Sequence, residues 1–158
     1  MKIEDIAGII EKSDGAVFST VNEKGYPESR ALLNLANKKQ YPELIGKALI
    51  TDGNRVSVYF TTNTSSRKVS QLRTNPKSSL YFCIPDKFLG AGLCGIMTEI
   101  TDQKIKDDFW QPGWRIYYHR GSSDPDYALL KFVSEDIRSW YHSAEHTFSV
   151  SSAENTKA

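Results

Sequence analysis

The stretch at residues 61–76 reads TTNTSSRKVSQLRTNP. It follows the β-branched and aromatic run VSVYF at residues 56–60, which predicts a strand. Ser65 or Ser66 is a suitable N-cap, and apolar residues at helical spacing follow it. The Asn-Pro pair at residues 75–76 ends the helix. The sequence therefore predicts a strand that runs through a hydroxyl-rich turn into a short helix.

The positive charges in the first turn of this helix oppose the helix dipole. Arg67 and Lys68 fall in the first turn, where each cation costs about 0.3–1 kcal/mol without compensation. No carboxylate between residues 56 and 77 offers a local partner. A bound anion would remove the conflict, because the free N–H groups of a helix start bind anions. Nearby hydroxyls would complete a phosphate cradle: Thr62, Ser65 and Ser66. The alternative is a solvated basic turn.

The composition is that of one globular domain. The chain has 158 residues, 20 basic and 19 acidic, which argues against a broad nucleic-acid surface and against disorder. No apolar run is as long as a membrane span, and the N-terminus is too polar for a signal peptide. Two cysteines give no disulfide framework, which indicates a reducing cytoplasm. We expect one domain at residues 1–150 and a polar tail at 151–158, in the cytoplasm, without nucleic-acid or membrane partners.

Short β-type segments separated by turns make up most of the remaining chain. Apolar residues at helical spacing predict an opening helix, and the turn Asn-Glu-Lys-Gly at residues 22–25 predicts a hairpin. Strands are predicted at residues 16–21, 27–35, 48–51, 56–62, 78–84 and 88–101, with a last pair at 127–133 and 137–142. Helical segments are predicted after Asp102 and at residues 113–119. This pattern predicts a mainly β fold, an antiparallel β-barrel with marginal helices.

A glycine-rich segment at residues 90–95, GAGLCG, has the glycine spacing of the dinucleotide-binding fingerprint but not its structural context. That fingerprint needs a helix to begin within it, whereas the following IMTEIT favours a strand. Gly90 and Gly92 then lie on one face of the strand and leave room for a close neighbour.

The metal-ligating residue types do not form a metal motif. The three histidines and two cysteines lack the close pair spacing of a zinc site, so we expect no metal. Cys83 and Cys94 alternate with apolar neighbours in predicted strands, which predicts buried thiols.

Aromatic residues gather late in the chain. Trp110 and Trp114 are four residues apart and share one helical face, close to Tyr117 and Tyr118. Packing in the core is one interpretation, and a flat ligand stacked on a ring is the other. The same two interpretations apply to Trp140.

These segments together resemble a known family. The Thr-Thr-Asn and Ser-Arg-Lys elements of residues 61–68, with Gln71-Leu72 and Asn75-Pro76, resemble the flavin-phosphate segment of the pyridoxamine 5′-phosphate oxidase-like family. The later residues are similar to its bacterial general stress protein branch: Trp114, Tyr117, Tyr118, Gly121, Asp124-Pro125-Asp126, Leu129 to Phe132 and Trp140. The resemblance covers nearly the whole chain and implies a split β-barrel that binds FMN.

The resemblance also implies roles for single residues. Arg30 corresponds to a strand arginine near the flavin and its phosphate, and Arg67 with Lys68 to the phosphate clamp. Trp140 corresponds to a tryptophan that closes the ring pocket. The other implied cofactor-binding residues are Leu32, Leu33, Thr61, Thr62 and Ser66. In this family the flavin lies at a subunit interface, so a homodimer is implied as well.

The chain departs from the true oxidase around the substrate. Leu35 stands in place of a lysine, Gly90 in place of a glutamine, and the residues after Trp140 lack the late Arg-x-His segment. The expectation is therefore an FMN-dependent oxidoreductase linked to stress response, with substrate, electron donor and catalytic residues unknown. The alternatives are a flavin-binding or sensor module without turnover, and a relative that binds haem or a deazaflavin.

Overall fold

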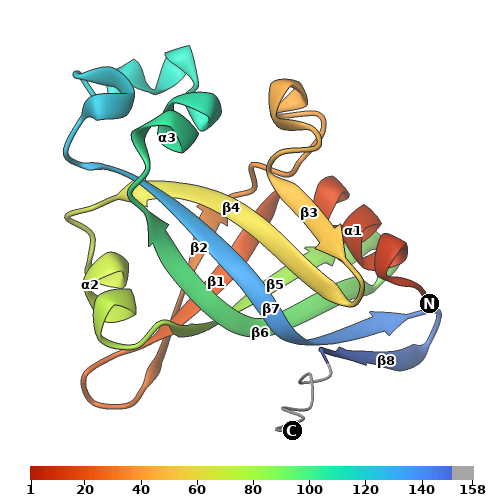
Figure 1. The fold of residues 1–158 in the computed structure, drawn as a ribbon. Coiled ribbons are helices and arrows are strands. Elements are labelled where there is room, and N and C mark those ends of the chain that lie inside the picture. The colour runs from red at the N-terminus through yellow and green to blue at the C-terminus, as the bar shows by residue number, and fades with distance from the viewer. Residues whose placement is uncertain (151–158) are drawn as a thin grey trace, which may run out of the picture.

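The fold is an antiparallel sheet that curves around a single core, seen in a computed structural model that describes residues 1–150 (Figure 1). The eight strands are β1 (Gly15–Val21), β2 (Pro27–Leu33), β3 (Leu49–Asp52), β4 (Arg55–Asn63), β5 (Lys77–Ile84), β6 (Leu89–Ile100), β7 (Tyr127–Tyr141) and β8 (Ala144–Ser149). Their order is β2-β1-β5-β6-β7-β4-β3, and β8 pairs with β7. The predicted mainly β class is confirmed, and the sheet is not closed because β2 and β3 are its edges.

Short helices lie at the margins of the sheet. They are α1 (Ile3–Lys12), α2 (Arg67–Thr74) and α3 (Gln103–Phe109), with 3-10 turns η1 (Pro42–Leu44), η2 (Pro85–Lys87), η3 (Pro112–Ile116) and η4 (Gly121–Ser123). Figure 1 shows α2 and α1 at opposite ends of the sheet. Among residues 1–150 no helix has the length and apolar content that crossing a membrane requires.

The core follows from two periodicities. In β4, Val56, Val58 and Phe60 alternate with less buried residues, and each is 0% exposed. This is the period of a strand with one face turned inward. In α1 the buried residues Ile6, Ile9 and Ile10 recur at helical spacing and cover the same core.

The prediction of two final strands at residues 127–133 and 137–142 is wrong, because β7 runs unbroken from Tyr127 to Tyr141. The polar residues between them fit a turn by composition, but they form a bulge in which Cys94 pairs with Asp136 and Gly95 with Ser134. Buried Ser134 accepts a hydrogen bond from the Val56 N–H at 2.8 Å through Oγ. The chain therefore bends at this point without reversing, and the last hairpin partner is β8.

The late aromatic cluster is mostly core. Trp110 meets the rings of Trp114, Tyr118 and Tyr127 edge-on at 5.9, 6.2 and 5.2 Å between centroids. Trp114 and Tyr118 are buried, whereas Tyr117 is exposed. The core interpretation therefore holds for three of the four residues. The segment predicted as a helix at 113–119 is the shorter turn η3.

The glycine-rich segment lies within β6, as predicted. Tyr81 of the neighbouring strand β5 lies so close to Gly90 that a Cβ atom at Gly90 would clash with the Tyr81 phenol oxygen.

The prediction of buried thiols is wrong for Cys94, which is exposed on the outer face of β6, while Cys83 is partly buried. The reason is that the alternation in β6 points Cys94 away from the core.

Gly95 provides a test of the bulge. A Cβ atom at this position would lie 2.9 Å from both the Phe132 ring and the Ser134 Cα, and closer still to the Val133 carbonyl oxygen. Gly95→Ala should lower the free energy of unfolding by about 1–3 kcal/mol, measured by denaturant titration.

The matched control is Gly113→Ala, whose new methyl group meets nothing within 4 Å. It should change stability by less than about 0.5 kcal/mol. Equal effects of the two substitutions would show that the close contact at the bulge is not what requires glycine.

Candidate functional site

The turn between β4 and α2 is fixed by one carboxylate from the start of β7. Asp126 accepts hydrogen bonds from Asn63 Nδ2 at 2.6 Å and from the Ser65 N–H at 2.7 Å. Its backbone carbonyl accepts from the Thr64 N–H at 2.8 Å. The hydrogen bonds from Asn63 and Ser65 hold the pKa of the Asp126 carboxyl below its ordinary value. Asp126 therefore sets the position from which α2 begins.

Three cations meet beside this helix start. Lys68 donates to Thr62 Oγ1 at 2.9 Å, and Arg30 of β2 donates to Thr20 Oγ1 at 2.6 Å. Burial, together with the Arg30 charge, lowers the pKa of Lys68. The pKa of Arg30 is also lowered, mainly by burial. The negative charge of Glu28 opposes this shift, and the positive charge of Arg67 adds to it. The three cations therefore lie within electrostatic reach of one another.

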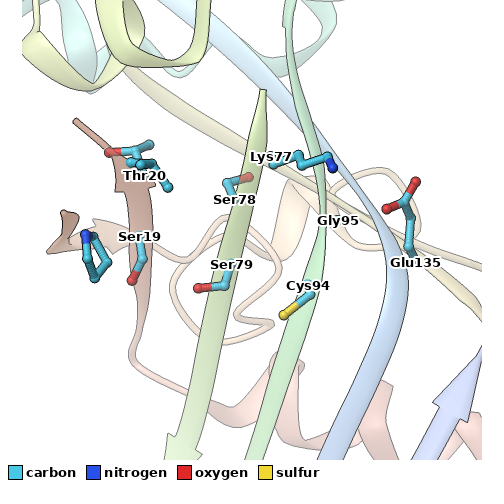
Figure 2. Close-up of a pocket in the computed structure, with 10 residues that line it drawn as sticks. Ser19, Thr20, Lys77, Ser78, Ser79, Cys94, Gly95 and Glu135 are labelled. Atoms are coloured by element: carbon cyan, nitrogen blue, oxygen red, sulfur yellow. The ribbon is translucent and has the colours of Figure 1, made fainter. Parts of the chain in front are cut away.

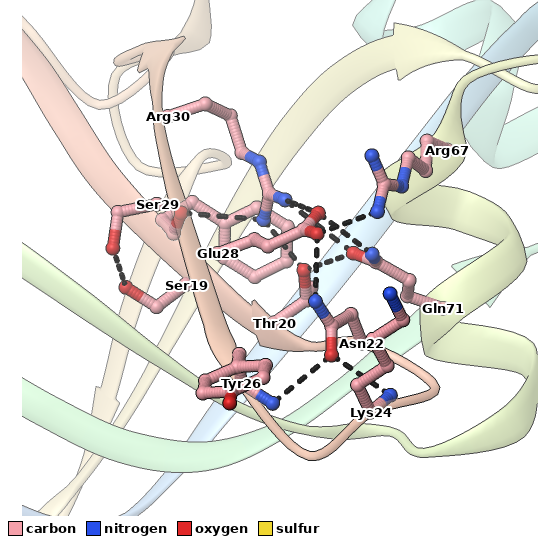
Figure 3. A network of polar contacts seen from close by, with 11 residues as sticks. Ser19, Thr20, Asn22, Lys24, Tyr26, Glu28, Ser29, Arg30, Arg67 and Gln71 are labelled. Atoms are coloured by element: carbon pink, nitrogen blue, oxygen red, sulfur yellow. Dashed lines mark hydrogen bonds and ion pairs between the residues drawn. The ribbon is translucent and has the colours of Figure 1, made fainter.

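One carboxylate, Glu28 of β2, lies between two of these cations, Arg30 and Arg67 (Figure 3). It accepts from Arg67 Nη2 at 2.6 Å, from Gln71 Nε2 at 2.8 Å and from Asn22 Nδ2 at 2.9 Å. Arg30 Nη2 lies 3.6 Å from it as an ion pair. The hydrogen bonds from Asn22 and Gln71, and then the two guanidinium charges, lower the pKa of Glu28. The compensation that Arg67 lacks within its own segment thus comes from a distant strand.

The site keeps an excess of positive charge. Arg30 and Arg67 share Glu28, and Lys68 has no ion-pair partner among residues 1–150. Ser66 occupies the N-cap of α2, yet its hydroxyl makes no capping hydrogen bond. Its buried Oγ has no hydrogen-bond partner within the described part of the chain. An unsatisfied hydroxyl beside three cations fits an anion with several acceptor oxygens, such as a phosphate group.

The structure brings most of the expected residues to this end of the sheet. Thr61 and Thr62 are buried in the last part of β4, and Thr61 donates to the Ala128 carbonyl at 3.3 Å. Leu32 and Leu33 lie further along β2, where Leu33 pairs with Gly15 just after α1, and they point to opposite faces, Leu32 half-buried and Leu33 exposed. Trp140 also lies away from the helix start, because it is opposite Gly90 near the other end of β7, and it is exposed.

The outer face of the sheet is apolar over several strands. Val17, Leu33, Tyr81 and Trp140 all point to this face and are 42–52% exposed. The register supports one surface, because Val17 pairs with Tyr81 and Gly90 with Trp140. A hollow of about 350 Å³ on this face is lined by small and polar side chains, among them Ser19, Ser79 and Cys94 (Figure 2). None of the expected cofactor-binding residues lines it.

Sequence reasoning missed Glu28, Gln71 and Asp126. Glu28 gave one local signal, since it lies two residues before Arg30 and a strand places such residues on the same face. Gln71 and the Asp-Pro-Asp segment contribute to the family resemblance, which gives their side chains no role. Neither signal indicates the partner of the side chain, because the contacts of Glu28 and Asp126 with the helix start span 39 and 61 residues.

Comparisons with known proteins agree on the fold and on a family. A sequence profile described as pyridoxamine 5′-phosphate oxidase matches residues 3–141. A Clostridium acetobutylicum protein related to general stress protein 26 of Bacillus subtilis, of the pyridoxinephosphate oxidase family, is 32% identical over 94% of this chain and 93% of its own, with a TM-score of 0.72.

More distant solved structures share the fold alone. General stress protein 26 of Bacillus anthracis is 18% identical, with 93% and 97% of the two chains covered and a TM-score of 0.67. A haem-binding protein of Mycobacterium smegmatis is 11% identical over 92% of this chain and 57% of its own, with a TM-score of 0.63. No curated protein matches the chain.

Asp126 yields a prediction about pH. Because hydrogen bonds from Asn63 and Ser65 hold its pKa below its ordinary value in the folded protein, the carboxylate stabilises the fold at pH values above its pKa in the unfolded chain. This contribution is lost as the pH falls through the folded-state pKa. Asp126→Asn should therefore lower the melting temperature at pH 7, and its difference from the wild type should shrink below about pH 4.

The comparison variant is Asp86→Asn in the exposed turn η2, which removes the same charge away from the site. It should leave the melting temperature nearly unchanged at pH 7. A constant difference between Asp126→Asn and wild type from pH 7 to pH 3 contradicts a role for the ionised carboxylate.

Proposed function

The chain belongs to the pyridoxamine 5′-phosphate oxidase family, and we propose that it binds FMN and works as a flavin-dependent oxidoreductase linked to stress response. The observation that carries the proposal is the group of three cations at the helix start with one carboxylate between two of them, and the unsatisfied Ser66 hydroxyl beside them. The similarity to a protein related to general stress protein 26 supports the link to stress.

The residues at the helix start fit the anionic end of FMN. Arg67, Lys68 and Arg30 would hold the phosphate through charge-assisted hydrogen bonds, and Ser66 would add a hydroxyl. Thr61 and Thr62 of β4, with Leu32 and Leu33 further along β2, would line the rest of the cofactor. Bound FMN supplies electron or hydride transfer, while the protein positions and tunes it.

A second copy of the chain would complete the site. The β7 residue Tyr127 pairs with Asn63, next to the helix start, whereas Trp140 lies about a dozen residues further along. At about 3.3 Å per residue this strand length is roughly 40 Å, too long for one flavin to touch both ends. The exposed apolar face formed by Val17, Leu33, Tyr81 and Trp140 offers a surface for a homodimer, in which Trp140 serves the partner's flavin.

The runner-up functions differ in turnover or in cofactor. Leu35, Gly90 and the missing Arg-x-His segment replace the substrate residues of the true oxidase, which favours a flavin-binding or sensor module over that reaction. Anaerobic mixing of the FMN-loaded protein with NADH or NADPH separates the two, since bleaching of the flavin absorbance marks a reductase.

The fold is also found in a haem-binding protein, which supports haem as an alternative cofactor, and a deazaflavin is a further alternative. The absorbance spectrum of the purified protein separates all three, because FMN, haem and a deazaflavin absorb at different wavelengths.

For the compartment we propose the cytoplasm, since both cysteines are free.

The cation cluster predicts a phosphate-specific loss. Arg67→Ala combined with Lys68→Ala should weaken FMN binding by several kcal/mol, at about 1.5–3 kcal/mol for each charge-assisted hydrogen bond lost. Riboflavin lacks the phosphate and serves as the internal control, so its affinity should barely change. Titration by flavin fluorescence measures both, and unchanged FMN affinity in the double variant would remove the phosphate assignment.

For Trp140 we expect a different pattern of FMN and riboflavin affinities. Trp140→Ala should weaken FMN and riboflavin equally, because an aromatic side chain contacts the ring and not the phosphate. Heterodimers of this variant with Arg67→Ala/Lys68→Ala extend the test. They should recover one tight FMN site per dimer, because one site then has intact cations from one copy and intact Trp140 from the other.

Recovery of no tight site in the heterodimer would show that Trp140 does not act on the partner's flavin. Loss of FMN affinity alone in Trp140→Ala would contradict a contact with the ring.

A further inference from the structure

Glu28 accepts hydrogen bonds from the side chains that a phosphate at the helix start would need. Its two carboxylate oxygens accept from Arg67 at 2.6 Å and from Gln71 at 2.8 Å, with Arg30 at 3.6 Å (Figure 3). A carboxylate and a phosphate oxygen use the same donors in the same way. The protein thus carries its own anion in the site assigned above to the cofactor.

We propose that Glu28 is an internal competitor for the phosphate, which weakens FMN binding and keeps the flavin exchangeable between the protein and solution. This inference rests on the proposed function, because it concerns how the same site holds its ligand. It assigns to Glu28 a role as an affinity-determining residue that neither the sequence motifs nor the resemblance indicates.

Two neighbours keep Glu28 in the site. Gln71 is buried, and its Oε1 accepts from Thr20 Oγ1 at 2.5 Å and from Arg30 Nη2 at 3.4 Å. Its amide N–H is thereby aimed at Glu28. Asn22, in the hairpin turn before β2, donates to the other side of the carboxylate at 2.9 Å. The carboxylate is therefore positioned from two elements even when Arg67 turns away.

Arg67 is the movable member of the group. Its side chain is 66% exposed, and Glu28 is its ion-pair partner within residues 1–150. A phosphate that recruits Arg67 must break this contact and then lie close to a fixed negative charge. Both effects oppose binding, and the repulsion from Glu28 grows with the charge of the ligand.

The effect of Glu28 on affinity should therefore depend on the charge of the ligand. Riboflavin carries no phosphate, so Glu28 should not affect its affinity, whereas FMN carries a phosphate that is mostly dianionic at neutral pH. Arg30 and Arg67 at Glu28, together with Lys68 at Thr62, leave a net charge of about +2 in this group. That excess still attracts a dianion, but less strongly than three uncompensated cations would.

The experiment compares FMN and riboflavin affinity in the full-length wild type and in Glu28→Gln, by flavin fluorescence titration at low salt. Glutamine keeps the size and one acceptor oxygen, which still accepts from Arg67 and Asn22, while its NH2 group cannot accept from Gln71. The substitution therefore removes the charge at the cost of one hydrogen bond. Glu28→Gln should bind FMN about tenfold more tightly, with a slower FMN dissociation rate, and riboflavin with unchanged affinity.

The matched control is Glu23→Gln at the tip of the same hairpin, where the side chain is exposed and makes no ion pair among the described residues. It changes the net charge of the protein equally and should leave FMN affinity unchanged. A double-mutant cycle adds a second readout: Arg67→Ala should cost more FMN affinity in the Glu28→Gln background than in wild type, since Arg67 is then free to serve the phosphate.

Each outcome decides between the two proposals. FMN binding by wild type with equal or weaker binding by Glu28→Gln overturns the competitor role and indicates that Glu28 positions Arg67 instead. A gain for riboflavin equal to that for FMN also overturns it. If neither wild type nor Glu28→Gln binds FMN, the proposed function fails together with this inference.

Discussion

Like charges held close together at the start of α2 are the constraint on which the site depends. Arg30, Arg67 and Lys68 repel one another, and two of them oppose the helix dipole as well. Such a group persists only with a counter-anion. Glu28 supplies part of the compensation within the protein, and the remaining positive charge is what makes the site suited to a phosphate group.

The sheet determines where these charges meet. β2 carries Glu28 and Arg30 on one face, and β4 leads into the turn that Asp126 holds in place. The same sheet has an outer face that the described helices do not cover, and there Tyr81 and Trp140 are exposed. Because β7 separates Trp140 from the helix start, the proposed flavin site links ligand binding to association: in that proposal the residues around one flavin would come from two copies.

The comparisons show why the fold cannot identify the cofactor. A general stress protein and a haem-binding protein both share this architecture with the chain. Function in such folds depends on the side chains placed at a site. Here the residues that favour a phosphate-bearing ligand are Arg30, Ser66, Arg67 and Lys68, while the departures at Leu35 and Gly90 remove residues that the true oxidase uses.

The sequence by itself determined the elements that depend on near neighbours. Alternation in residues 56–60, an N-cap at Ser65 or Ser66 and the paired cations after it predicted the strand, the turn and the charged helix start. Hydrogen-bonding partners distant in the chain were decided only by the tertiary structure. The pairing of Glu28 with Arg67, the hold of Asp126 on Ser65 and the continuity of β7 through Ser134 all depend on strand order and register. Local periodicity reports which face of a segment is buried, but it does not report which other segment that face will meet.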